Sequence, residues 1–147
     1  MAVTAFWYSN GLAMLTGGTA AGGTAIDYLS DTLKLSLHLN YTPNQFTHIN
    51  WADVSGSEIA ATGGYTAGGS ALQSKTIAVS NGTVTFDFAD QTYSGSTISA
   101  TQAVIVDTSI AGSVLLGYVD FGGTVSSSGG NWTYTVAAGG AFTIVAA

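Results

Sequence analysis

Residues 98–123 read ISATQAVIVDTSIAGSVLLGYVDFGG and contain two apolar runs, AVIV and SVLLGYV. Both runs are short, contain β-branched residues and are bounded by Asp, Ser and Gly. At this length such a composition favours buried strands over helices. A small polar loop joins the runs, and Asp-Phe-Gly-Gly at 120–123 closes the second one. The stretch therefore predicts a pair of buried strands, and it contains no cluster of residues suited to catalysis.

A third strand is predicted by TLKLSLHLN at 32–40, where leucine occupies every second position. Successive side chains of a strand point to opposite faces, so the four leucines share one face. Lys34, Ser36 and His38 fall on the other face. We expect this polar face, with His38 on it, to lie toward solvent.

Two hairpins are predicted further along the chain. KTIAVSNGTVTFDF at 75–88 places Asn-Gly between two alternating runs, and both residues tolerate the positive φ of a type I′ turn. Ile77 and Val79 would then share a face with Val84, Phe86 and Phe88. NWTYTV and AFTIVA, separated by AAGG at 137–140, predict a second hairpin near the C-terminus.

The whole pattern predicts an all-β fold, an antiparallel β-sandwich or barrel of about seven or eight strands. Residues 1–147 have the length of a single domain. The segment from Phe6 to Leu15 predicts either an initial aromatic strand or a short helix that begins near Ser9. The Gly-rich segment 16–25 is expected to be a flexible connector or a loop held by its neighbours.

Residues 41–56 contain the single proline and several Asn and Asp residues, which predicts a long loop. One helical turn is expected around Trp51 to Val54. We expect Phe46 and Trp51 to anchor this loop.

The composition argues against several classes of protein. Charged residues make up 7% of the chain, against roughly a quarter in ordinary domains. With two lysines, no arginine and a net charge of −6, the chain lacks the clustered cations that bind nucleic acid. No apolar run approaches the roughly 20 residues of a membrane-spanning helix. We therefore expect neither nucleic acid nor a membrane as partner.

Catalytic, metal-binding and cofactor-binding residues are not expected either. The chain has no cysteine, so a thiolate site and a Cys nucleophile are excluded. The two histidines, His38 and His48, are better explained by a strand face and by polar packing against Trp51 than by catalysis or metal ligation. Asp87 and Asp90 would allow a weak calcium site, but their spacing lacks an EF-hand pattern.

Three further aspartates are interpreted as turn residues. Asp107 and Asp120 each follow a predicted strand, where Asp commonly closes a turn through its own backbone hydrogen bonds. Asp27 and Asp31 bracket YLS ahead of the leucine strand, and Asp31 is expected to form a turn. The sequence thus predicts a protein that is not an enzyme.

Several segments together resemble a family of small virion structural proteins of tailed bacteriophages and prophages. They are FWY at 6–8, DTLKLSL at 31–37, YTPNQ at 41–45, YTAGG at 65–69, AVIVDT, LLGYVDFGG, NWTYTV and AFTIVA. The similarity runs from Phe6 to the C-terminus. It implies a compact β-rich particle protein without catalytic residues.

The resemblance leads to a capsid decoration or cement protein as the first hypothesis. Such a protein sits on the outer surface of the capsid, binds the major capsid protein and, we expect, forms a homotrimer. The alternative is a tail, neck or head-fibre component, with a structural or receptor-binding role. An enzyme such as a glycan hydrolase is a third class, which would need two converging carboxylates, for instance Asp87 or Asp120.

Five aromatic residues are candidates for the contact with a partner: Phe6, Trp7, Tyr8, Phe46 and Trp51. The first three either pack in the core or lie at a subunit or capsid contact, where aromatic residues often dominate binding. Because open β-edges with few charges invite pairing, we also expect self-association.

Overall fold

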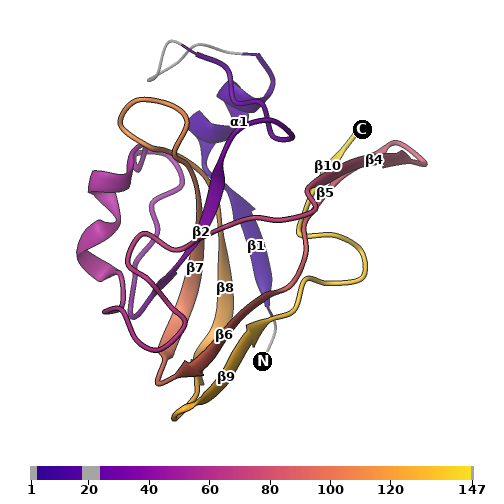
Figure 1. Cartoon of the computed structure of the whole chain (residues 1–147). Helices are drawn as coiled ribbons and strands as arrows, with labels where there is room; N and C mark the ends of the chain where they lie inside the picture. Colours follow the sequence, from indigo (N-terminus) through magenta and orange to yellow (C-terminus); the bar gives the residue numbers. More distant parts are fainter. Residues whose placement is uncertain (1–2, 18–23, 147) are drawn as a thin grey trace.

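The predicted central strand pair is present in the computed structural model, which describes residues 3–17 and 24–146 (Figure 1). In this part of the chain ten strands pair antiparallel, and the all-β prediction is confirmed. The strands are β1 (Thr4–Trp7), β2 (Leu33–His38), β3 (Ser70–Ala71), β4 (Thr76–Ser80), β5 (Thr83–Asp87), β6 (Gln91–Ser96), β7 (Ser99–Asp107), β8 (Val114–Ser126), β9 (Gly130–Tyr134) and β10 (Phe142–Val145). The helices are α1 (Ser9–Leu15) and two 3₁₀ turns, η1 (Trp51–Asp53) and η2 (Ser55–Ser57).

The largest sheet has the order β1-β8-β7-β2-β3, with β7 and β8 near its centre. A two-stranded sheet, β6-β9, and a three-stranded sheet, β10-β5-β4, contribute side chains to one face of it. The resulting core contains Leu35, Ile105 and Leu116 from the large sheet and Tyr93 and Trp132 from β6 and β9. This arrangement is a β-sandwich.

The opposite face of the large sheet is covered as well. A smaller apolar cluster joins Val104, Val106 and Leu115 of β7 and β8 to Tyr41 and Val54 of the loop that follows β2. The predicted helical turn at Trp51 is present as η1, directly followed by η2. The central strands are therefore buried on both faces.

Two strand boundaries differ from the sequence prediction. Asp-Phe-Gly-Gly does not close the strand, because β8 continues to Ser126, and Asp120 lies within β8. NWTYTV and AFTIVA do not form a hairpin with each other, since β9 pairs with β6 and β10 pairs with β5. Gly140, with φ of 94°, lies in the connection that carries the chain from one small sheet to the other.

Both alternatives for the N-terminal segment occur in succession, as β1 and then α1. Gly11 makes the packing of α1 on β8 possible, because a Cβ at this position would lie 2.2 Å from the Leu115 carbonyl oxygen and 2.8 Å from Leu116 Cα. The Gly-rich segment 16–25 lies mostly outside the described residues, which omit 18–23.

Replacing Gly11 should show how strongly the close approach of α1 to β8 is required. We expect Gly11→Ala to lower the free energy of unfolding by at least about 2 kcal/mol, because the overlap with backbone atoms exceeds the gain in helix propensity. Urea denaturation measures this change. Gly56→Ala is the matched control, since nothing lies within 4 Å of its Cβ position. Equal stability of the two variants would contradict the explanation.

Candidate interaction site

The three N-terminal aromatic candidates differ in how much surface they leave for a partner. Phe6 stacks on Tyr118 with ring centroids 4.9 Å apart, and Trp7 packs against Phe142 at 4.8 Å. Both are half-buried. Tyr8 is fully buried, so the core alternative holds for this residue. A contact role for Phe6 and Trp7 stays a prediction.

The two candidates in the loop after β2 also behave differently. Trp51 is half-buried beside the ring of His38, as an anchor should be. Phe46 is 80% exposed, so the prediction that it anchors the loop is wrong. The anchor of this turn is Asn44, whose Oδ1 accepts the backbone N–H of Phe46 at 3.1 Å and of Thr47 at 3.2 Å. The phenyl ring is thus presented to solvent on a hydrogen-bonded turn.

His38 does not face solvent, and this part of the sequence prediction is wrong. It is fully buried because the loop after β2 covers that face of the sheet. Its Nε2 lies 2.9 Å from Ser36 Oγ, and its Nδ1 lies 2.9 Å from Ser57 Oγ. Burial lowers the pKa of the imidazole to about 4, because the charged form would lose its hydration. His38 is therefore a neutral structural residue at pH 7.

His48 belongs to a chain of hydrogen bonds on the same side of the sheet. The Tyr8 hydroxyl lies 2.7 Å from the Tyr41 hydroxyl, which in turn lies 2.6 Å from His48 Nδ1. Burial raises the pKa of Tyr8 and of Tyr41, so both phenols stay protonated. The ring of His48 stacks on Tyr41, whereas the sequence predicted polar packing against Trp51.

The acidic residues mostly serve turns and strand ends. The turn expected at Asp31 is present, since Asp31 Oδ2 accepts the backbone N–H of Asp27 at 2.7 Å, and Asp27 Oδ1 accepts the N–H of Leu29 and Ser30, both at 3.1 Å. Asp87 Oδ1 accepts the N–H of the next residue, and Asp90 Oδ1 accepts the N–H of Val136. Within residues 3–17 and 24–146, no three His or acidic side chains are placed to hold a metal ion.

Asp107 combines the predicted turn with an unexpected burial. Its Oδ1 accepts the N–H of Ser109 at 2.8 Å, while its buried Oδ2 has no donor among the described residues. Burial raises the pKa of this carboxyl to about 6, and the nearby carboxyl of Asp31 adds to the rise through a hydrogen bond and charge repulsion. Protonation of this carboxyl removes the cost of holding a charged carboxylate whose buried Oδ2 has no donor among the described residues.

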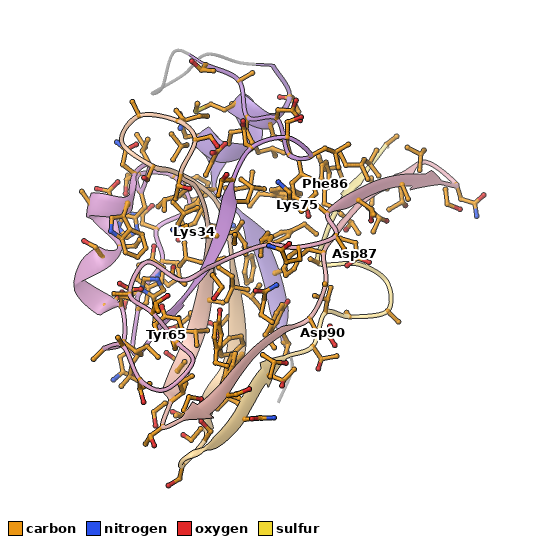
Figure 2. The ribbon with its side chains drawn as sticks, in the orientation of Figure 1. Lys34, Tyr65, Lys75, Phe86, Asp87 and Asp90 are labelled. Carbon is orange, nitrogen blue, oxygen red and sulfur yellow. The ribbon has the colours of Figure 1, made fainter. Side chains whose placement is uncertain are left out.

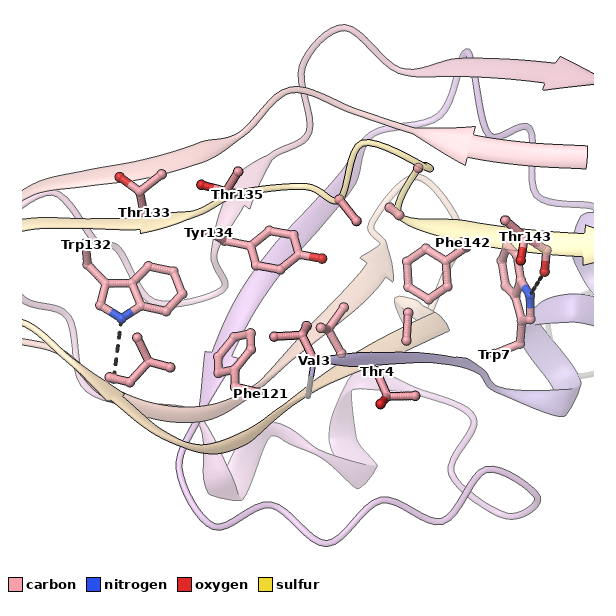
Figure 3. A pocket seen from close by; sticks show the side chains of 16 residues that line it. Val3, Thr4, Trp7, Phe121, Trp132, Thr133, Tyr134, Thr135, Phe142 and Thr143 are labelled. Carbon is pink, nitrogen blue, oxygen red and sulfur yellow. Dashed lines mark hydrogen bonds between the residues drawn. The ribbon is translucent and has the colours of Figure 1, made fainter. Parts of the chain in front are cut away.

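An apolar groove of about 640 Å³ lies between β1 and the chain that runs from β9 to β10 (Figure 3). Its aromatic lining consists of Trp7, Phe121, Trp132, Tyr134 and Phe142, and every other lining residue is Val, Ala, Gly or Thr. The volume falls in the range of ligand sites. Because its lining carries no charge, the groove suits an uncharged, apolar occupant.

Backbone groups at one wall of the groove lack strand partners. β1 is the outer strand of the large sheet and pairs with β8. Tyr8, which directly follows β1, donates its N–H to the carbonyl oxygen of Leu116 in β8 at 3.1 Å. Since alternate residues of an antiparallel strand bond to the neighbour, the amide groups of Ala5 and Trp7 point to the open edge. The Trp7 carbonyl accepts a hydrogen bond from Gln45 Nε2. The N–H groups of Ala5 and Trp7 and the Ala5 carbonyl remain available there.

The second notable surface is the hairpin β4–β5, which extends away from the body of the molecule and is called here the projecting hairpin (Figure 1). The predicted Asn-Gly turn is confirmed, with φ of 49° at Asn81 and 75° at Gly82. Val79 lies opposite Val84, and Ile77 lies opposite Phe86. The apolar face predicted from the sequence is therefore present.

This apolar face is only partly covered. Phe86 is buried at the base of the hairpin, whereas Ile77 is 42% exposed and Val79 is 74% exposed. No residue from Thr76 to Phe86 carries a charge, and Lys75 and Asp87 lie where the hairpin leaves the body (Figure 2). Ser80 and Thr83 flank a two-residue turn and therefore form a hydrogen-bonded pair of the ladder. Hydrogen-bonded and non-hydrogen-bonded pairs alternate along an antiparallel ladder, so the backbone N–H and C=O groups of Ile77 and Val79 point away from β5, to the open edge of β4.

No family model, curated protein or solved structure matches this chain. Among the described residues, no helix is both long and apolar enough to cross a membrane. The groove and the exposed face of the projecting hairpin were not named as sites from the sequence. The alternation of Ile77 and Val79 was a signal for the latter, whereas the groove joins residues from both ends of the chain.

Burial of neutral His38 predicts a loss of stability in mild acid. The unfolded chain takes up this proton near pH 6.5 and the folded chain only near pH 4, so unfolding is favoured as the pH falls through that interval. We expect a loss of about 2 kcal/mol between pH 7 and pH 4 that is missing in His38→Gln. Urea denaturation of both proteins across this range measures the difference. Parallel pH profiles of the two proteins would contradict the assignment.

The buried carboxyl of Asp107, with that of Asp31 nearby, predicts the opposite pH dependence, in which stability increases as the pH falls. Because the pKa of Asp107 is raised to about 6 in the folded chain, its ionisation destabilises the fold above that pH, and the penalty disappears as the pH falls toward 4. We expect Asp107→Asn to increase the free energy of unfolding at pH 8 by about 1–2 kcal/mol and to give no gain near pH 4. Asp120→Asn is the control, because Asp120 is half exposed on β8. A destabilised Asp107→Asn at pH 8 would contradict the explanation.

Proposed function

We propose that this protein is a non-enzymatic virion structural protein, a capsid decoration protein that binds the major capsid protein on the outer shell. The observation that carries the proposal is the presentation of Phe46, 80% exposed on a turn that Asn44 holds by two backbone hydrogen bonds. An aromatic side chain held in place outside the core gains most when a partner buries it. The sequence resemblance supports the assignment of the protein to a virion particle.

The surroundings of Phe46 support the same role. Gln45 forms hydrogen bonds with both ends of the β1–α1 connection. Its side-chain Nε2 donates to the Trp7 carbonyl oxygen, and its backbone carbonyl oxygen accepts the N–H of Ser9. The turn is therefore braced against the large sheet. A braced contact loses little conformational entropy on binding, which favours a permanent lattice partner over a transient one.

The copy number on purified particles tests this proposal. Quantitative mass spectrometry should find about one chain per shell subunit, as a symmetric lattice partner requires. A far lower ratio would support a tail, neck or head-fibre component instead, and absence from the particle would overturn both alternatives.

A matched pair of variants tests the role of Phe46. We expect Phe46→Ser to reduce occupancy on particles at least about tenfold, which corresponds to 1.4 kcal/mol of binding free energy. Leu29→Ser is the control, because Leu29 is also exposed, at 53%, but lies far from this turn in the chain. Equal occupancy of the two variants would show that Phe46 does not take part in the contact.

A further inference from the structure

We infer that the groove is the acceptor for the projecting hairpin of a second copy of this chain, so that copies associate head to tail. In this contact β4 of one copy would add as a strand to the free edge of β1 in the next. The inference concerns the isolated chain and does not depend on the decoration role.

The backbone groups on the two sides match. The open edge of β1 offers the amide groups of Ala5 and the N–H of Trp7, and the open edge of β4 offers the amide groups of Ile77 and Val79. β1 has four residues and β4 has five. Pairing of such edges is an established way for one chain to bind another.

The side chains match in chemistry. Ile77 and Val79 are the exposed apolar residues of the hairpin, and the groove beside β1 is lined by aromatic and small uncharged side chains. Neither surface carries a charge, so the contact buries no ion and is not opposed locally by the net charge of −6. An apolar segment that already forms a strand also loses little entropy when it docks.

A single molecule cannot make this contact with itself as the chain is folded. The hairpin extends away from the body, while the groove lies beside β1 and the β9–β10 connection (Figures 1 and 3). The donor and acceptor are therefore two different surfaces, which is a heterologous contact that closes into a ring or continues as a chain. A ring of three would be the trimer expected from the sequence.

Two single substitutions separate the donor from the acceptor. Val79→Lys places a charge on the exposed face of the hairpin, and Ala5→Lys places one at the exposed edge of the groove. Each residue is exposed, so both variants should fold, which circular dichroism checks. Leu29→Lys carries the same change of charge at an exposed apolar position outside both surfaces.

Sedimentation velocity across a dilution series gives the decisive comparison. We expect the parent chain and Leu29→Lys to associate, and Val79→Lys and Ala5→Lys each to stay monomeric. An equimolar mixture of the two monomeric variants should form a dimer, because one supplies an intact hairpin and the other an intact groove. The tryptophan emission of Trp7 and Trp132, which line the groove, should shift to the blue as this dimer forms.

Three results would overturn the inference. The first is a parent chain that stays monomeric up to about 100 µM, which would place the dissociation constant of the contact above that concentration. The second is association of Ala5→Lys alone, which would indicate symmetric pairing of two β4 strands. The third is a mixture that remains monomeric. None of these results changes the copy number on particles, so the two proposals fail separately.

Discussion

Burial of β7 and β8 on both faces is the constraint on which the rest of the structure depends. Val104 and Leu115 point to one side, and Ile105 and Leu116 point to the other. A sheet whose central strands are apolar on both faces needs a covering layer on each. The small sheets provide one layer and the loop after β2 provides the other. The positions of Phe46, of His38 and of the groove follow from how these two layers fit.

Local signals allowed the central features to be predicted. The apolar runs of β7 and β8, the alternation in β2 and the Asn-Gly turn each specify a short segment through its own side chains. Pairing between distant segments was not accessible in the same way. β9 and β10 lie close in sequence and both alternate, but each pairs with a strand some 40 to 60 residues earlier. Local periodicity contains no information about that choice.

The candidate site was predictable to a smaller extent, for related reasons. His38 was placed on a solvent-facing side because a polar strand face usually indicates water, whereas here Ser36 and Ser57 satisfy its ring nitrogens inside a second layer. Phe46 was expected inside because it is aromatic, but the hydrogen bonds of Asn44 determine the turn and leave the ring outside. The groove joins β1, β8, β9 and β10, whose residues show no shared pattern in the sequence.

The distribution of charge explains why the two open edges are significant together. Proteins commonly protect edge strands with charged residues, prolines, bulges or very short length. β3, at one end of the large sheet, is only two residues long. β1 and β4 have neither charge nor proline, and a chain with 7% charged residues has few to place there. In the projecting hairpin, β5 is paired with β10, and Val84 packs against the core, whereas Ile77 and Val79 on the outer strand β4 stay exposed. Within this three-stranded sheet, β4 is thus the strand whose apolar side chains and open edge gain burial when a second surface covers Ile77 and Val79.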